Sequence, residues 1–160
     1  MRIALTVAGV AATLALPAGA AASPATEIFH RHGLFGSWAV DCSRPPSLAN
    51  PHVVYRVADG DRVERWVSVE PGRIVDLSTI DHAAEPSPTV LVISWQTREG
   101  GVTNRILLRD GRIKVLDSTR SSGEKLFVDG RRVHDRAEAP WFGRCGTGHA
   151  DVRLAPLADA

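Results

Sequence analysis

Short apolar runs that alternate with turn-forming residues fill the chain from Gly36 onward. The runs are rich in Val, Ile, Leu and Trp, and the breaks between them, about ten residues apart, contain the Gly, Asp and Pro typical of antiparallel turns. No segment keeps a helical apolar period over the length of a normal helix. We therefore predict strands near 36–42, 52–58, 62–70, 73–81, 88–98, 102–109, 112–119 and 125–129, with one further candidate at 132–136.

Alternation inside these runs favours strands that bury one face. In the run TVLVISWQT, Leu91, Ile93 and Trp95 share a face, because successive side chains on a strand point to opposite sides. The valine face of the strand at 62–70 also carries Arg65. An irregular register or an edge position is the interpretation that we favour for this charge, and an arginine that points into a barrel is the alternative.

The predicted fold is therefore all-β, an antiparallel meander of about eight strands. Such a meander closes into a barrel, which removes the exposed sheet edges, and a β-sandwich is the alternative. The segment EPSPT at 85–89 is expected to be a loop between two halves of the sheet. The proline-rich segment 42–52 is expected to run over a surface or cap an opening, because proline cannot donate to a central ladder.

The first residues resemble a secretory signal peptide in composition. Arg2 precedes an apolar run at 3–16, and small residues follow up to Ala22. The run is shorter than the roughly 20 residues of a membrane-spanning helix, although an uncleaved anchor is the alternative. We predict a signal peptide at 1–22, an N-terminal arm at 23–35, a β-barrel domain at 36–145 and a C-terminal tail at 146–160. The expected location is periplasmic or secreted, with no membrane span after signal cleavage.

The charge balance argues against a nucleic-acid partner. The chain has 19 Lys and Arg against 18 Asp and Glu, so loss of Arg2 with the signal peptide leaves it formally neutral. Proteins that bind nucleic acid through its phosphates usually carry a basic excess or stripe. The densest basic segment, GRRVHDR at 130–136, contains an acidic residue and is interpreted as a solvated strand end.

The two cysteines, Cys42 and Cys145, are expected to form a disulfide. An even number of cysteines in an exported chain favours pairing, and two cysteines allow one pairing only. A zinc site and a catalytic thiol are the alternatives, but two thiols make a poor zinc site and catalysis needs an unpaired cysteine. Trp38 and Trp141 each lie four residues before a cysteine, so both rings are expected to cover the pole where the chain ends meet.

The motif Gly36-Ser37-Trp38, which follows a short arm and begins the first strand, resembles the Gly-x-Trp motif of lipocalins and related calycin barrels. In that superfamily the tryptophan lies at the closed end of the barrel and a basic residue of the last strand packs on it. The resemblance implies this role for Arg136 or Arg144. The chain is also similar in outline to exported bacterial metalloprotease inhibitors, which are small eight-stranded barrels with an N-terminal arm. No ligand-binding residue of either family carries over.

Candidate catalytic and metal-binding groups are few. His30 and His32 could hold copper or nickel, but a solvated arm is the favoured interpretation. Acid–histidine neighbours occur at 81–82 and 134–135, yet neighbours on a strand point to opposite faces. Asp76 and Asp81 do not share a strand face, which makes them a poor glycosidase pair. The chain has no nucleophile elbow, phosphate loop or zinc-protease motif. No enzymatic activity, cofactor or metal is expected.

The preferred hypothesis for function is a non-catalytic binding module. Trp66, Trp95 and Arg65 are the predicted ligand-binding residues, and the segment 43–51 would act as a lid. The expected partner is a small ligand or a periplasmic protein.

Two alternatives stay open. An inhibitor-like protein would insert its arm, residues 23–35, into the cleft of a protease. An enzyme would use a polar cluster of Asp81, His82 and Glu85.

Overall fold

The computed structural model describes residues 24–146, so the predicted signal peptide and all but the first residue of the predicted tail lie outside the described residues. The elements, in chain order, are α1 Pro24–Arg31, β1 Gly36–Ala39, β2 His52–Ala58, β3 Arg62–Glu70, β4 Arg73–Ser87, β5 Val90–Thr97, β6 Gly100–Arg109, β7 Arg112–Arg120, β8 Lys125–Val128, β9 Arg131–Arg132 and β10 Phe142–Arg144.

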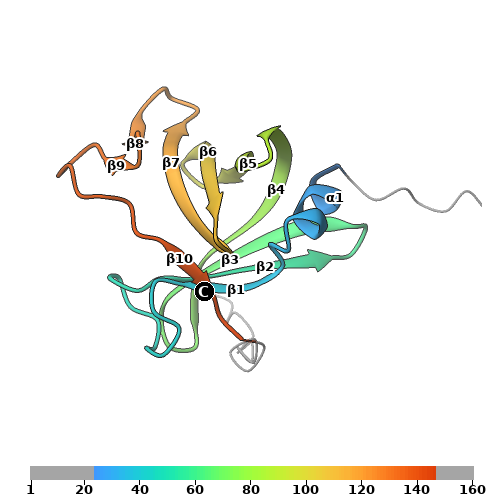
Figure 1. Cartoon of the computed structure of the whole chain (residues 1–160), viewed down its shortest axis with the longest axis horizontal. Helices are drawn as coiled ribbons and strands as arrows, with labels where there is room; N and C mark the ends of the chain where they lie inside the picture. Colours follow the sequence, from blue (N-terminus) through green and yellow to red (C-terminus); the bar gives the residue numbers. More distant parts are fainter. Residues whose placement is uncertain (1–23, 147–160) are drawn as a thin grey trace, which may run out of the picture.

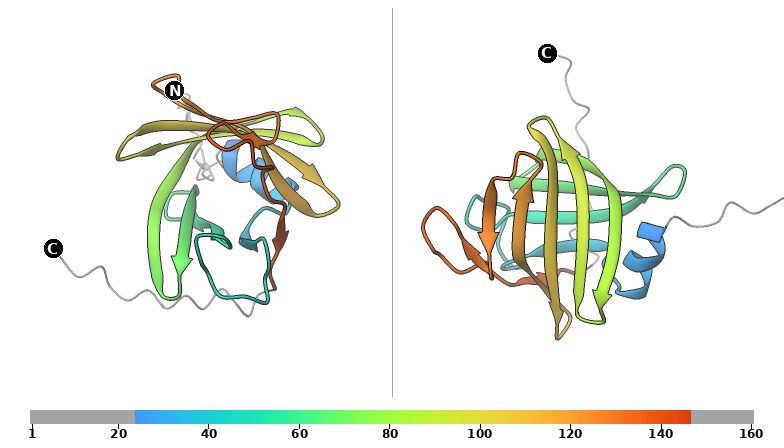
Figure 2. Two further views of the ribbon diagram at one scale, coloured as in Figure 1. Left: turned by 90° about the vertical axis from the view of Figure 1, so that its left-hand side faces the viewer. Right: turned by 90° about the horizontal axis from the view of Figure 1, so that it is seen from above.

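Eight of these strands form a closed antiparallel barrel. Strands β1 to β7 follow one another as a meander, and β10 pairs with both β1 and β7 to complete the ring (Figures 1 and 2). Strands β8 and β9 extend the sheet beyond β7. The predicted all-β meander and barrel closure are confirmed, and the sandwich alternative is wrong.

One edge of β7 serves two partners. Its first residues, Arg112 and Ile113, pair with β10, whereas Ser118 and Thr119 near its end pair with β8. The β8–β9 hairpin therefore stands to one side of the barrel (Figure 2). Within residues 24–146, no helix is long and apolar enough to cross a membrane.

The eight predicted strands all form with small shifts of their ends, and three larger differences concern β4, β9 and β10. The expected loop at 85–89 is wrong, because β4 continues to Ser87. A register irregularity between Ala84 and Ser87 accommodates Pro86, which cannot donate to the ladder. The candidate at 132–136 contributes only the second residue of β9, and β10 was not among the predicted strands.

Inward-facing side chains of the barrel pack into one core. Leu91, Ile93 and Trp95 are all buried, which confirms the alternation predicted for β5. Helix α1 covers one end of this core and packs against β4 and β3 (Figure 1). Its Phe29 is 1% exposed and meets the ring of Tyr55 edge-on, with 5.1 Å between the ring centroids. The N-terminal arm is thus a docked helix of two turns.

A disulfide joins the two ends of the barrel domain. Cys42 and Cys145 are 103 positions apart in sequence, and their Cα atoms lie 5.3 Å apart, which confirms the predicted pairing. The backbone N–H of Cys145 also donates to the carbonyl of Ser37. Because β10 has only three residues, the disulfide holds its end against β1, where few ladder bonds are available.

Replacing both cysteines, Cys42→Ser with Cys145→Ser, should lower the free energy of unfolding by about 3 to 5 kcal/mol, because the unfolded chain regains the freedom that closure of so long a loop removes. Equilibrium urea unfolding measures the difference. A reductant should destabilise the wild-type protein similarly and leave the double variant unchanged. A loss below about 1 kcal/mol would contradict the role of the disulfide in closure.

Candidate functional site

Arg65 points into the barrel. Its Cα lies opposite Tyr55 on β2 and Ser78 on β4, both of which are buried. Its guanidinium lies 4.5 Å from the ring centroid of Trp95, on β5, and its side chain is 16% exposed. The favoured interpretation of an irregular or edge position is therefore wrong, and the alternative of an inward-pointing charge is correct.

The Arg65 charge is neutralised inside the barrel. Its Nη1 donates to Asp76 Oδ2, and the hydroxyl of Ser78 donates to Asp76 Oδ1 at 2.7 Å. Burial raises the pKa of Tyr55, and the nearby Arg65 charge opposes that rise. The interior polar groups thus bind one another, and the Arg65 guanidinium packs against the Trp95 indole, an arrangement in which cation–π attraction adds to the ion pair.

Trp66 lies on the opposite face of β3, outside the barrel. Its Cα is opposite Val54 and Leu77, and the guanidinium of Arg56 packs 3.8 Å from its ring centroid. Its indole N–H donates to Glu64 Oε2 at 3.0 Å. The structure therefore brings Arg65 and Trp95 together. It places Trp66 on the outer face, where Arg56 covers the ring and the residue is 8% exposed.

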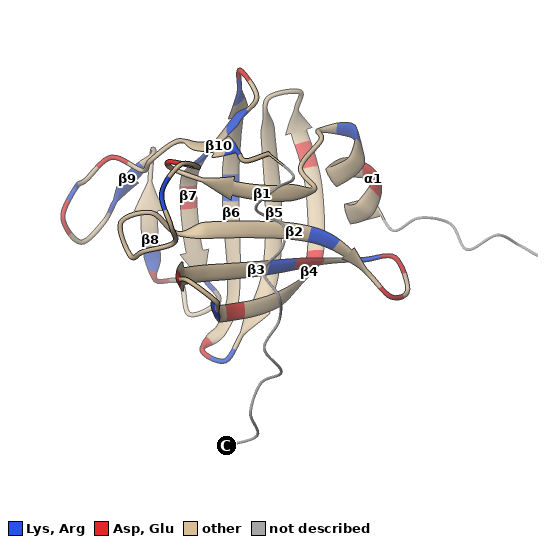
Figure 3. Cartoon of the chain, turned by 90° about the horizontal axis from the view of Figure 1, so that it is seen from below, with Lys and Arg blue, Asp and Glu red and all other residues tan. Residues whose placement is uncertain are grey.

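That outer surface contains exposed aliphatic side chains. Leu77 is 54% exposed and Val75, two positions away on the same face of β4, is 45% exposed. Most charged residues of β2 and β3 lie toward the end of these strands that is nearer α1, whereas Glu70 ends β3 on the opposite side (Figure 3). We refer to Val54, Trp66, Val75 and Leu77, with the Arg56 guanidinium on the indole, as the outer tryptophan face.

Trp38 lies in the buried core. It is 3% exposed, and its indole N–H donates to the carbonyl of Leu34 at 2.7 Å. Arg144 is its cross-strand partner on β10, but the guanidinium donates to the carbonyl of Phe35, and none of the cation–π contacts in the described part of the chain involves Trp38. The other candidate, Arg136, lies beyond β9 in the 133–141 segment.

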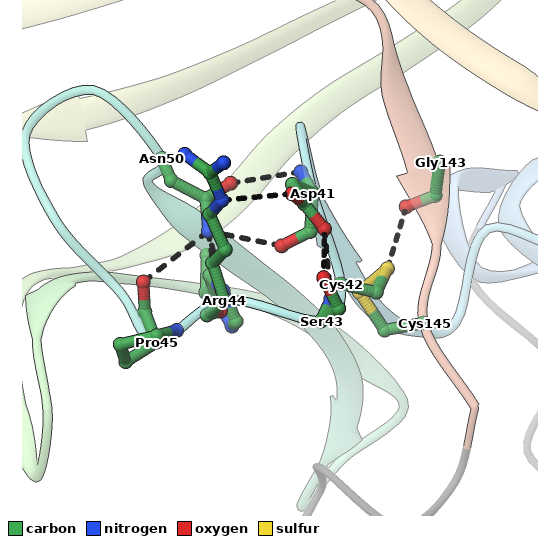
Figure 4. The surroundings of a disulfide bond; sticks show 9 residues. Asp41, Cys42, Ser43, Arg44, Pro45, Asn50, Gly143 and Cys145 are labelled. Carbon is green, nitrogen blue, oxygen red and sulfur yellow. Dashed lines mark hydrogen bonds and ion pairs between the residues drawn. A yellow bond between two sulfur atoms is a disulfide. The ribbon is translucent and has the colours of Figure 1, made fainter.

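The segment 43–51, predicted as a lid, folds around one buried side chain (Figure 4). The Asn50 amide donates to the carbonyls of Asp41, Arg44 and Pro45, and its oxygen accepts the N–H of Asp41. The segment contains prolines and lies outside the sheet, so its backbone groups have no ladder partners. The Asn50 side chain supplies hydrogen bonds to several of them. The loop is therefore a compact structure beside the disulfide.

Glu85 holds α1 against β4. Its carboxylate lies 2.7 Å from Arg31 Nη1 and 3.3 Å from His32 Nε2. The polar contact with His32, followed by that with Arg31, lowers the pKa of Glu85. Asp81 and His82 are exposed, so Glu85 contacts the end of the helix and not these two residues.

The two arm histidines have separate surroundings. His30 meets Phe35 edge-on at 4.7 Å, whereas His32 faces Glu85. Among residues 24–146, no group of three or more His, Cys, Asp or Glu side chains is placed to hold a metal ion.

Two hollows open on the surface. The larger, about 310 Å³, lies across the ends of β5, β6 and β7, and its lining residues are Ser94, Trp95, Gln96, Gly101, Val102, Thr103, Thr119, Arg120 and Ser121. The smaller, about 200 Å³, lies at the β6–β7 turn and is lined by Arg109, Asp110, Arg112 and Trp141.

Comparison of the chain with protein-family models, curated proteins and solved structures found no match. The likeness to lipocalins is thus a likeness of architecture.

Sequence reasoning missed three contacts that shape these sites. Asp76 was considered only as a catalytic acid, although an acid near an inward arginine on the next strand is a natural partner. The Arg56–Trp66 stack and the contacts of Arg112 and Lys114 with Trp141 were also missed, because they depend on cross-strand register. For the first two contacts the signal is the hairpin turn, which fixes the residues that face each other, whereas the Trp141 contacts arise from the non-local pairing of β10 with β7.

The phenol of Tyr55 should ionise at a pH above the usual tyrosine range, and the protein should unfold as it ionises. Because burial raises the folded-state pKa, the contribution of Tyr55 to stability is fully present below about pH 10 and is lost as the pH rises toward the folded-state pKa. Tyr55 is the only tyrosine, so phenolate absorbance follows it alone. Tyr55→Phe should remove this alkaline component. Ionisation near pH 10 with an intact β-sheet circular dichroism spectrum would contradict burial of the phenol.

Glu85→Gln should loosen α1. Because the folded-state pKa of Glu85 is lowered, its pairing stabilises docking above the ordinary glutamate pKa near 4.3 and is lost as the pH falls through the folded-state value. At neutral pH the variant should show faster amide hydrogen exchange at Phe29 than the wild type, and the difference should vanish in acid. Glu70→Gln, which removes the partner of Arg73, is the matched control and should leave α1 unchanged.

Proposed function

We propose that the protein is an exported, non-catalytic binding protein with a lipocalin-like barrel, and that it binds a partner protein through the outer tryptophan face. The observation that carries this proposal is the row of Val54, Trp66 and Leu77 across three strands, with an arginine stacked on the indole.

The interior favours a structural role over ligand binding. Ligand-binding pockets combine an apolar cavity with a few polar groups left free to orient the ligand. Inside this barrel Arg65 is engaged by Asp76 and Trp95, and the aromatic ring of Phe29 fills the end covered by α1. A small ligand would therefore have to displace existing contacts.

The outer face has the composition of a protein-binding hot spot. Tryptophan and arginine are enriched among the residues that dominate binding energy, and aliphatic neighbours around them exclude water. Trp66 is 8% exposed and is held by Arg56 on its ring and by Glu64 on its indole N–H, so it would form a fixed floor that loses little side-chain freedom on binding. Leu77 and Val75 supply exposed apolar area beside it.

Two features support an exported location. The domain carries a disulfide, which persists in oxidising compartments such as the periplasm. The N-terminal sequence has the charge, apolar run and small residues of a signal peptide.

The two alternative functions have less support. An inhibitor that inserts its arm needs a projecting segment, whereas α1 is docked through Phe29 and Glu85. A catalytic cluster built on Glu85 would have to compete with Arg31 and His32 for its carboxylate.

The substitution Leu77→Asp tests the proposal, because it places a charge on the outer face next to Trp66 without entering the core. Wild-type and variant proteins are immobilised, and proteins retained from the exported fraction of the native organism are quantified. We expect at least about a tenfold loss of a specific partner, corresponding to about 1.4 kcal/mol.

Val133→Asp is the matched control, because Val133 is a similarly exposed aliphatic residue beyond β9. It should retain the partner at the wild-type level. Equal retention by all three proteins, or an equal loss in both variants, would reject the outer tryptophan face as the binding surface.

A further inference from the structure

The hollow at the β6–β7 turn has an unusual arrangement of charge. The turn residues Asp110 and Gly111 both have positive φ, the backbone of a tight two-residue hairpin. This turn places Arg109 directly opposite Arg112. Like charges directly opposite each other in an antiparallel pair are destabilising, so the fold itself gives no reason for two arginines here.

The β3–β4 hairpin shows the complementary arrangement. Its turn sequence EPGR matches RDGR in length, and the two flanking residues, Glu70 and Arg73, also lie opposite each other. There the charges are opposite and form an ion pair. The comparison shows that the β6–β7 hairpin lacks the carboxylate that balances its counterpart.

The two arginines at this hollow are poorly neutralised by the protein. Among the described residues, Arg112 has no carboxylate within ion-pairing distance. Arg109 lies 3.5 Å from Asp110, but both side chains are more than two-thirds exposed, so this pair is weak. The nearby Lys114 is already paired with Glu138.

Trp141 gives the hollow an aromatic wall. The Arg112 guanidinium lies 5.9 Å from its ring centroid, compared with 3.8 Å for the stacked pair of Arg56 and Trp66. Arg112 is thus near the indole without being seated on it. Its cross-strand partner on β10 is Gly143, where a Cβ would meet no atom within 4 Å, so the adjacent surface is open.

We propose that this hollow binds a small organic anion, with its carboxylate or phosphate between Arg109 and Arg112 and a flat apolar part against Trp141. Guanidinium groups match the oxygen spacing of carboxylate and phosphate, which allows paired hydrogen bonds. The volume of about 200 Å³ suits a single ring with one anionic substituent. The site lies on different strands from the outer tryptophan face and does not depend on the partner proposed for that face.

Titration of the folded protein with benzoate, inorganic phosphate and benzyl alcohol tests the site, with the indole N–H signal of Trp141 followed by nuclear magnetic resonance. Trp141→Phe assigns that signal. We expect saturable shifts with benzoate, weaker saturable binding of phosphate and no saturable shift with benzyl alcohol. Arg112→Ala should weaken benzoate binding by about tenfold or more, because a charge-assisted hydrogen bond is lost.

Arg73→Ala is the matched control, since it removes the arginine at the same position of the other hairpin. It should leave benzoate binding unchanged, and unchanged thermal unfolding of both variants shows that they are folded. Equal weakening by both substitutions would show that general charge attraction causes the binding and would overturn the proposal. Equal binding of benzyl alcohol, binding of phosphate without benzoate, or no saturable benzoate binding would overturn it as well.

Discussion

Closure of the barrel depends on a strand of only three residues. Strand β10 pairs with β1 on one side and with the first residues of β7 on the other, so the ring of strands closes only because β10 is in place. So short a strand offers few ladder bonds, and the disulfide at Cys145 holds it where those bonds can form. The disulfide between the two ends of the barrel domain thus helps to close a meander whose last strand is short. The surface beside β10 remains open.

The second constraint is the charge inside the barrel. Arg65 occupies a position where an aliphatic residue would be expected from its neighbours, and it is accommodated by Asp76 on the next strand and by Trp95 one strand farther. Removing one member of a partly buried pair leaves the other without compensation. The same ion pair that stabilises the interior also occupies the Arg65 guanidinium, which is why the binding surfaces proposed for this protein lie outside the barrel.

Local signals in the sequence were sufficient for most of the fold. Alternation and turn residues placed the strands, and the cysteine count gave the disulfide. Strand β10 has no alternation to detect in three residues, and β4 continues through a proline that usually marks a loop. The faces of Trp66 and Trp95 could not be compared from sequence, because a register irregularity between Ile80 and His82 changes which residues of β4 point inward. Which of the predicted site residues lie together depends on this long-range register, which local patterns do not carry.

Because β7 pairs with β10 at its beginning and with β8 at its end, the fold can accept insertions between these two strands. The chain leaves the barrel through β8 at the end of β7 and returns through β10 at its beginning, so the excursion starts and finishes on one strand. Its tip, at 133–136, contributes no pairing to the eight barrel strands. Lengthening or exchanging this tip would leave the shear of the barrel unaltered. The excursion is therefore a natural point for grafting a foreign peptide onto the scaffold, and a place where related chains can diverge in length without refolding the rest.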